Sequence, residues 1–123
     1  MKKLSVIIFL VALFFISCNR ERPGILDFDA KLKIENTSTS GYITGVYYGT
    51  VGPGSTNRLS SNIGPGESKT FTLDVDDDSI YDIKVTSNLD GYEEYTNTHY
   101  DFGWDETFII EITDNGWYTD SSW

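Results

Sequence analysis

Apolar and polar residues alternate along four stretches of this chain. This period of two is typical of a β-strand that has one buried face and one face in water. In the last of the four stretches, for example, Phe108, Ile110 and Ile112 form the apolar side. The pattern therefore predicts strands within 28–35, 70–75, 81–86 and 107–112.

Two more strands are predicted from composition. Residues 42–51 are rich in β-branched and aromatic side chains on both faces, as expected of a central strand, and residues 92–100 are rich in Tyr and Thr. Gly, Pro, Asn and Asp separate the strands, most clearly at 52–57 and 64–67. Residues 19 onward show no amphipathic helical period. We therefore predict an all-β fold, a small antiparallel β-sandwich of six to seven strands.

The succession of strand and turn motifs is similar to that of a known class of domain. The motifs are Asn36-x-Ser38, Ile43 to Tyr48, Gly64 to Ser68 and Tyr81 to Val85. They resemble the small immunoglobulin-like (Ig-like) β-sandwich domains of bacterial exported proteins, many of which have no assigned function. The resemblance covers residues 30–112. It implies the fold and no catalytic residue, because every motif is a strand or a turn.

The N-terminus has the pattern of an export signal. Lys2 and Lys3 precede an apolar run from Leu4 to Ile16. That run has 13 residues, whereas a helix that spans the bilayer needs about 20. We therefore predict a signal peptide over residues 1–17 that is cleaved, rather than a transmembrane helix.

The end of this signal resembles the lipobox of bacterial lipoproteins. Ser17 is the small residue expected before the cut, whereas Phe15 replaces the usual Leu. The resemblance implies cleavage before Cys18 and a covalent lipid on its thiol, so that residues 18–27 form a tether to the membrane. The alternative is an ordinary secretory signal that leaves a free thiol. In some bacteria an Asp directly after the lipidated cysteine retains the lipoprotein at the inner membrane. This chain has Asn19 at that position, which favours the outer membrane of a bacterial cell envelope.

We place the β-sandwich domain at residues 28–114 and an aromatic tail at 115–123, either a docked edge segment or a flexible end.

The net charge is −10, and it becomes −12 when cleavage of the signal removes two lysines. Such a chain repels nucleic acid. With one histidine, His99, one cysteine and no Gly-x-Ser-x-Gly motif, the sequence predicts no catalytic residue and no enzyme. A small hydrolase built on carboxylates is the least favoured alternative.

An acidic turn is a candidate calcium site. Asp76, Asp77 and Asp78 offer the oxygen ligands that calcium prefers. The turn fails as an EF-hand loop, because Ser79 stands where Gly is needed and Val85 stands where Glu is needed. We favour a solvated acidic turn over a looser calcium site, and we predict no cofactor beyond the lipid.

Exposed aromatic residues suggest a ligand platform. Tyr92 and Tyr100 have the same parity on one predicted strand, and Trp104 lies on the turn that follows. Together they would offer flat apolar area to a peptide or a sugar ring; alternatively, they pack against neighbouring strands. The leading hypothesis is a lipid-anchored, non-enzymatic interaction module with a protein partner. The alternatives are a carbohydrate-binding module and a calcium-stabilised, adhesin-like domain.

Overall fold

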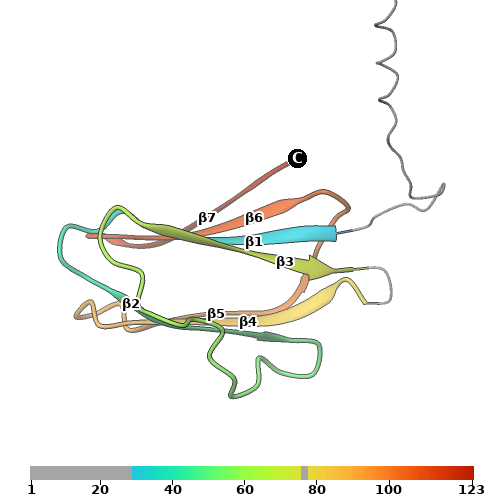
Figure 1. Ribbon diagram of the computed structural model, residues 1–123, viewed down its shortest axis with the longest axis horizontal. Helices are drawn as coiled ribbons and strands as arrows, with labels where there is room; N and C mark the ends of the chain where they lie inside the picture. Colours follow the sequence, from blue (N-terminus) through green and yellow to red (C-terminus); the bar gives the residue numbers. More distant parts are fainter. Residues whose placement is uncertain (1–28, 76–77) are drawn as a thin grey trace, which may run out of the picture.

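The computed structural model describes residues 29–75 and 78–123. These residues form seven strands in two facing sheets (Figure 1), with no helix in them long and apolar enough to cross a membrane. One sheet has the order β3-β1-β6-β7 and the other the order β2-β4-β5. The strands are β1 (Asp29–Asn36), β2 (Ile43–Gly49), β3 (Ser68–Asp74), β4 (Ile80–Ser87), β5 (Glu94–Asp101), β6 (Thr107–Thr113) and β7 (Gly116–Ser122).

The all-β class is confirmed, but the prediction of a purely antiparallel sandwich is wrong. β1 and β6 pair in parallel, from Lys31 beside Thr107 to Asn36 beside Ile112, so the four-stranded sheet is mixed. Parallel neighbours need a long connection, and here the chain builds the whole second sheet between them. Alternation predicts which face of a strand is buried and says nothing about the direction of its neighbour.

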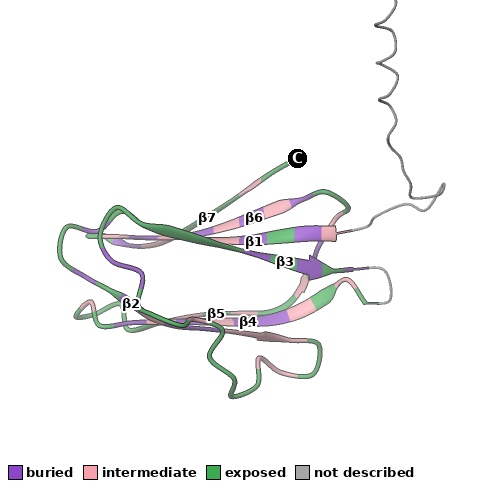
Figure 2. Cartoon of the chain, in the orientation of Figure 1, coloured by how far each residue is buried: buried purple, intermediate pink, exposed green. Residues whose placement is uncertain are grey.

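The core lies between the two sheets. Buried positions alternate with half-buried or exposed ones along β1 and β6 (Figure 2), as the sequence predicts. The parallel register sets Ile34 beside Ile110. Burial of these apolar side chains is the main stabilising contribution. The core consists of Ala30, Leu32, Ile34, Ile43, Val46, Ile63, Phe71, Leu73, Val75, Ile83, Val85, Phe102, Phe108, Ile110 and Ile112.

The strand β7 lies beyond the predicted end of the domain at residue 114. It pairs antiparallel with β6 along its whole length and forms one edge of the mixed sheet. Its polar sequence shows little alternation, because an edge strand buries few side chains. Trp117 is half-buried and packs against Tyr95 with ring centroids 5.8 Å apart. Residues 116–122 are therefore part of the sheet.

Candidate functional site

The outer edge of β2 is covered by the 57–63 segment. Ile63 and Ile43 exchange two backbone hydrogen bonds of 2.9 Å, as neighbouring strands do. The side chain of Asn57 acts in the same way: its Oδ1 accepts the Val46 N–H at 3.1 Å, and its Nδ2 donates to a second β2 carbonyl at 3.0 Å. Side chains and a short bridge thus satisfy the backbone of this edge, which is one way that proteins prevent unwanted strand pairing.

The outer edge of β3 is open along its middle. The Asn36 N–H donates to the Glu67 carbonyl at 3.0 Å, so Asn36 and Glu67 form a hydrogen-bonded pair of the antiparallel ladder between β1 and β3. Bonded positions alternate in such a ladder, so the residues of β3 that bond to β1 are 69, 71 and 73. Ser68, Thr70 and Thr72 therefore direct their backbone N–H and C=O groups away from β1, toward the edge.

Both ends of this open edge are closed by contacts. At the far end the Tyr81 hydroxyl donates to the Asp74 carbonyl at 3.1 Å. At the near end Oε1 of Glu67 accepts the Gly64 N–H at 2.8 Å, which holds the turn that leads into β3. We call the residues from Ser68 to Thr72 the β3 edge.

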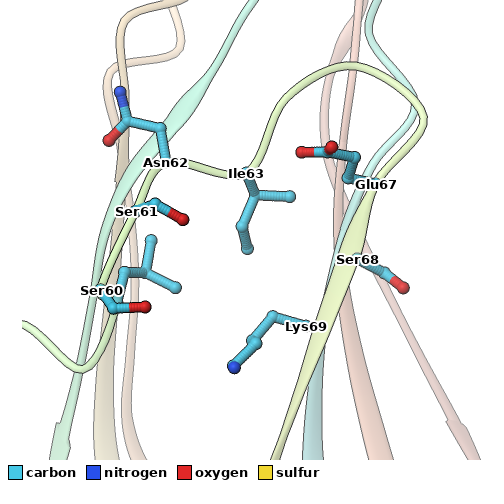
Figure 3. Close-up of a pocket in the computed structure, with 8 residues that line it drawn as sticks. Ser60, Ser61, Asn62, Ile63, Glu67, Ser68 and Lys69 are labelled. Atoms are coloured by element: carbon cyan, nitrogen blue, oxygen red, sulfur yellow. The ribbon is translucent and has the colours of Figure 1, made fainter.

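A cavity of about 360 Å³ adjoins the β3 edge. It lies between the first residues of β3 and the segment that covers β2, and the Lys69 side chain extends across it (Figure 3). A second cavity, of about 250 Å³, shares Glu67 and Ser68 with it. The residues that line the larger cavity are Leu59, Ser60, Ser61, Asn62, Ile63, Glu67, Ser68 and Lys69.

Cationic side chains lie on both faces of the sheet beside this edge: Lys69 is on the inner face with the cavity, whereas Lys31 and Lys33 are on the outer face. Three of the five cationic side chains in the described residues, Lys31, Lys33 and Lys69, belong to β1 and β3. The other two lie over tyrosine rings of β2: Arg58 is 4.3 Å from the Tyr48 ring centre, and Lys84 is similarly placed. Lys33 pairs with Glu35 at 2.9 Å. Within residues 29–75 and 78–123, Lys69 forms no ion pair.

The structure does not bring the predicted aromatic platform together. Tyr92 precedes β5 and packs against Gly116, where β7 begins. Tyr100 is near the other end of β5, half-buried, with its ring stacked 3.9 Å from that of Phe108. Trp104 is exposed on the loop between β5 and β6. Tyr92 and Trp104 thus lie at opposite ends of the sandwich, and Tyr100 faces its interior.

A β-bulge explains why Tyr100 turns inward. Tyr81 pairs with Tyr100 but Ile83 pairs with Asn97, so one strand has an extra residue between these pairs. His99 occupies the bulge with a φ of 63°. An extra residue shifts the alternation by one position, and Tyr100 therefore leaves the outer face on which a regular strand would place it.

The carboxylate of Asp82 holds this bulge. It accepts the His99 N–H at 2.8 Å and, from the loop that follows β2, the Gly52 N–H at 2.7 Å. These two backbone hydrogen bonds stabilise the ionised form and lower the pKa of Asp82 below its ordinary value. His99 Nδ1 lies 3.4 Å from the same carboxylate, and its ring is exposed. The arrangement fixes the backbone geometry of the bulge.

Glu106 is the most buried carboxylate in the described residues. Its Oε1 accepts the Gly103 N–H at 2.7 Å, and its Oε2 accepts the Tyr100 hydroxyl. The Tyr100 hydroxyl also lies 3.1 Å from Ser121 Oγ. Burial, followed by the hydrogen bond to Glu106, raises the pKa of Tyr100 to about 12. The cluster joins β5, β7 and the loop before β6, and every polar group in it is engaged within the fold.

Only one of the three proposed calcium ligands lies in the described part of the chain. Asp78 is exposed, and its Oδ1 accepts the Ile80 N–H at 3.1 Å; Asp76 and Asp77 lie outside the described residues, as does Cys18. Among residues 29–75 and 78–123, no group of three or more His, Cys, Asp or Glu side chains is placed to hold a metal ion. The solvated acidic turn, with a looser calcium site as its alternative, therefore stays a prediction.

Comparison with known proteins gives a distant similarity to solved structures. No protein-family model matches the sequence, and no curated protein sequence matches it. Among solved structures, the chain is similar to the NMR structure of a protein from Eubacterium rectale. The two are 18% identical, the match covers 77% of this chain and 93% of that one, and the TM-score is 0.47.

Proposed function

We propose that this protein is a non-enzymatic binding module that takes up an extended segment of a partner protein along the β3 edge. The observation that supports this proposal is the contrast between two sheet edges on the same side of the sandwich. Hydrogen bonds from Asn57 and Ile63 cover β2, whereas the β3 edge presents backbone groups beside a cavity. An added strand would form main-chain hydrogen bonds there and place alternate side chains toward the cavity.

The proposal includes the cellular setting inferred from the sequence. A signal over residues 1–17 and a lipid on Cys18 would hold the domain at the bacterial envelope, with the outer membrane favoured. The short β3 edge offers three outward-facing residues, so we expect weak binding to a free peptide. Tethering raises the effective concentration of such a module for a partner at the same surface. We also propose that the two-sheet domain belongs to the Ig-like class.

A glycan partner is less favoured than a protein partner. Stacking on a sugar ring needs aromatic side chains that share one accessible face. Tyr92, Tyr100 and Trp104 lie apart, and the Tyr100 ring is already stacked on Phe108. The described residues thus favour a site that forms hydrogen bonds with the main chain of a partner protein.

Thr70→Pro is expected to weaken peptide binding about tenfold, because it removes an outward N–H and blocks close approach of a strand. It takes no hydrogen bond from β1, since the Thr70 N–H points away from that strand. The probe is a phage library of random nine-residue peptides selected on the full chain, with affinities of the enriched peptides measured by fluorescence anisotropy. In the wild-type protein, bound peptide should protect the Thr70 amide from hydrogen exchange.

The matched control is Thr119→Pro. Thr119 is on β7, the other edge of the same sheet. The hairpin between β6 and β7 closes at the pair Thr113 and Gly116, so by alternation the Thr119 N–H also points outward. This variant should bind the enriched peptides within about twofold of wild type. Equal loss in both variants, or no protection of the Thr70 amide, would contradict the proposal.

Cys18→Ala is expected to release the protein from membranes. A protein with several acyl chains partitions into the detergent phase of a Triton X-114 extract, whereas one without acyl chains enters the aqueous phase. The measurement is the distribution of the expressed full chain between the two phases, with Ser17→Ala as the control that keeps a small residue before the cut. If the Cys18→Ala variant stays in the detergent phase, the anchor does not depend on this cysteine.

A further inference from the structure

The charge of Lys69, which lines the cavity beside the β3 edge, indicates the chemistry of the partner. We infer that the segment added to β3 carries a carboxylate at the position that faces Lys69. This inference rests on the proposed function, because it assumes that a strand is added at this edge. It goes further by assigning the Lys69 cavity as the pocket that selects one side chain of that strand.

Lys69 stands at one of the positions on the β3 edge where opposing side chains come closest. Its own backbone groups bond to β1, so toward an added antiparallel strand it forms a non-hydrogen-bonded pair. Such pairs bring Cα atoms to about 4.5 Å, against about 5.5 Å for hydrogen-bonded pairs. An Asp or Glu opposite Lys69 therefore lies within ion-pair distance without a change in the backbone.

The cavity around Lys69 offers hydrogen-bond donors to a carboxylate. Ser60, Ser61 and Asn62 line its opposite wall and supply hydroxyl and amide donors, and Ile63 adds an apolar surface. Glu67 is the other charged residue of the cavity, and its Oε1 is engaged by the Gly64 N–H. Lys69, which forms no ion pair within the described residues, is thus the cation available to a ligand there.

Charge also argues against a second copy of this chain as the occupant. In an antiparallel pairing of two β3 edges, the lysines at position 69 of the two molecules would lie on the same face, near each other. Each chain also has a net charge of −10, so two copies repel. A partner strand with an acidic residue opposite Lys69 avoids the repulsion between two lysines. Because the buried Phe71 is two positions along β3, we expect an apolar residue two positions from the acid.

Two labelled peptides test the inference directly. The first, TVTVTDTVT, has an Asp with an apolar residue two positions away on each side, so it satisfies the pattern in either strand direction; the second, TVTVTNTVT, replaces the Asp with Asn. On the full chain at low salt, the Asp peptide should bind about tenfold more tightly, as measured by fluorescence anisotropy. Raising the salt concentration should reduce the difference.

Lys69→Gln should bring the two affinities within about twofold of each other, because it removes the charge and keeps most of the side chain. Lys84→Gln, on the other sheet and over a tyrosine ring, is the matched control and should keep the preference for Asp.

The outcomes separate this inference from the proposed function. If Thr70→Pro weakens both peptides but wild type binds them equally, or if Lys69→Gln keeps the preference, the acidic partner is wrong and strand addition stands. If Thr70→Pro leaves the affinity of both peptides unchanged, strand addition at the β3 edge is wrong as well. If neither peptide binds but the phage library yields acid-free peptides that depend on Thr70, only the acidic partner is overturned.

Discussion

Asn36→Ala is expected to lower the free energy of unfolding by about 3 kcal/mol, because it leaves several buried polar groups without partners. Asn36 is fully buried at the end of β1, and its Nδ2 donates to the carbonyls of Gly41 at 2.8 Å and Ile63 at 2.9 Å. Its Oδ1 accepts from the N–H of Ser38 at 3.0 Å and from the hydroxyl of the same residue at 2.6 Å. Alanine can make none of these four hydrogen bonds.

The loss of the Asn36 hydrogen bonds should also loosen the segment that lines the cavity beside the β3 edge. Ile63 belongs to the segment that covers β2 and lines this cavity, and Asn36 ties that segment to β1. Urea unfolding followed by tryptophan fluorescence measures the effect. Asn62→Ala is the control, because Asn62 is exposed on the same segment, and it should change stability by less than about 0.5 kcal/mol. Similar losses in the two variants would show that the Asn36 network contributes little.

Ile110→Ala should destabilise the domain by about 3 to 4 kcal/mol. Ile110 is fully buried on β6, between β1 and β7, and lies beside Ile34 in the parallel register. The change removes three carbons from a position enclosed by both sheets, so the loss of burial adds to the cost of a cavity. Ile110→Val, which removes one carbon, should cost about 1 kcal/mol.

The neighbouring residue provides a matched control. Ile109 has the same side chain on the same strand, but it lies on the outer face and is only half-buried. Ile109→Ala should cost less than about 1 kcal/mol, because less apolar area returns to water. Urea unfolding of the three variants would measure this difference. If Ile109→Ala were as costly as Ile110→Ala, the assignment of inner and outer faces to β6 would be wrong.

Alternation of apolar and polar residues predicts much of the fold. It correctly places strands at β1, β3, β4 and β6 and identifies their buried faces, because each has one side in the core. It gives no information on strand order or direction, which depend on contacts between residues far apart in the sequence. The parallel pairing of β1 with β6 was therefore not predicted, and the edge strand β7 was predicted only as one of two alternatives for the tail.

The candidate site could not be predicted from the sequence, because it depends on strand order. The sequence shows that Phe71 and Leu73 are buried, but only strand order shows that β3 lies at an edge. Likewise, the sequence places Asn57 in a flexible loop. In the structure its side chain forms the hydrogen bonds to β2 that a neighbouring strand would form. The bulge at His99 carries no signal in a single sequence, and it moved Tyr100 from the predicted outer face to the interior.

The parallel pair of β1 and β6 has a consequence for how the protein folds. Residue 31 must meet residue 107, so the centre of the mixed sheet cannot form until almost the whole chain is available. Contacts between such distant positions slow folding, because a long loop must close first. During synthesis from the N-terminus, β1 would emerge early, and its edge toward β6 would remain unpaired. A chaperone that binds unpaired strands would therefore be expected to act on this chain before β6, which begins at Thr107, becomes available.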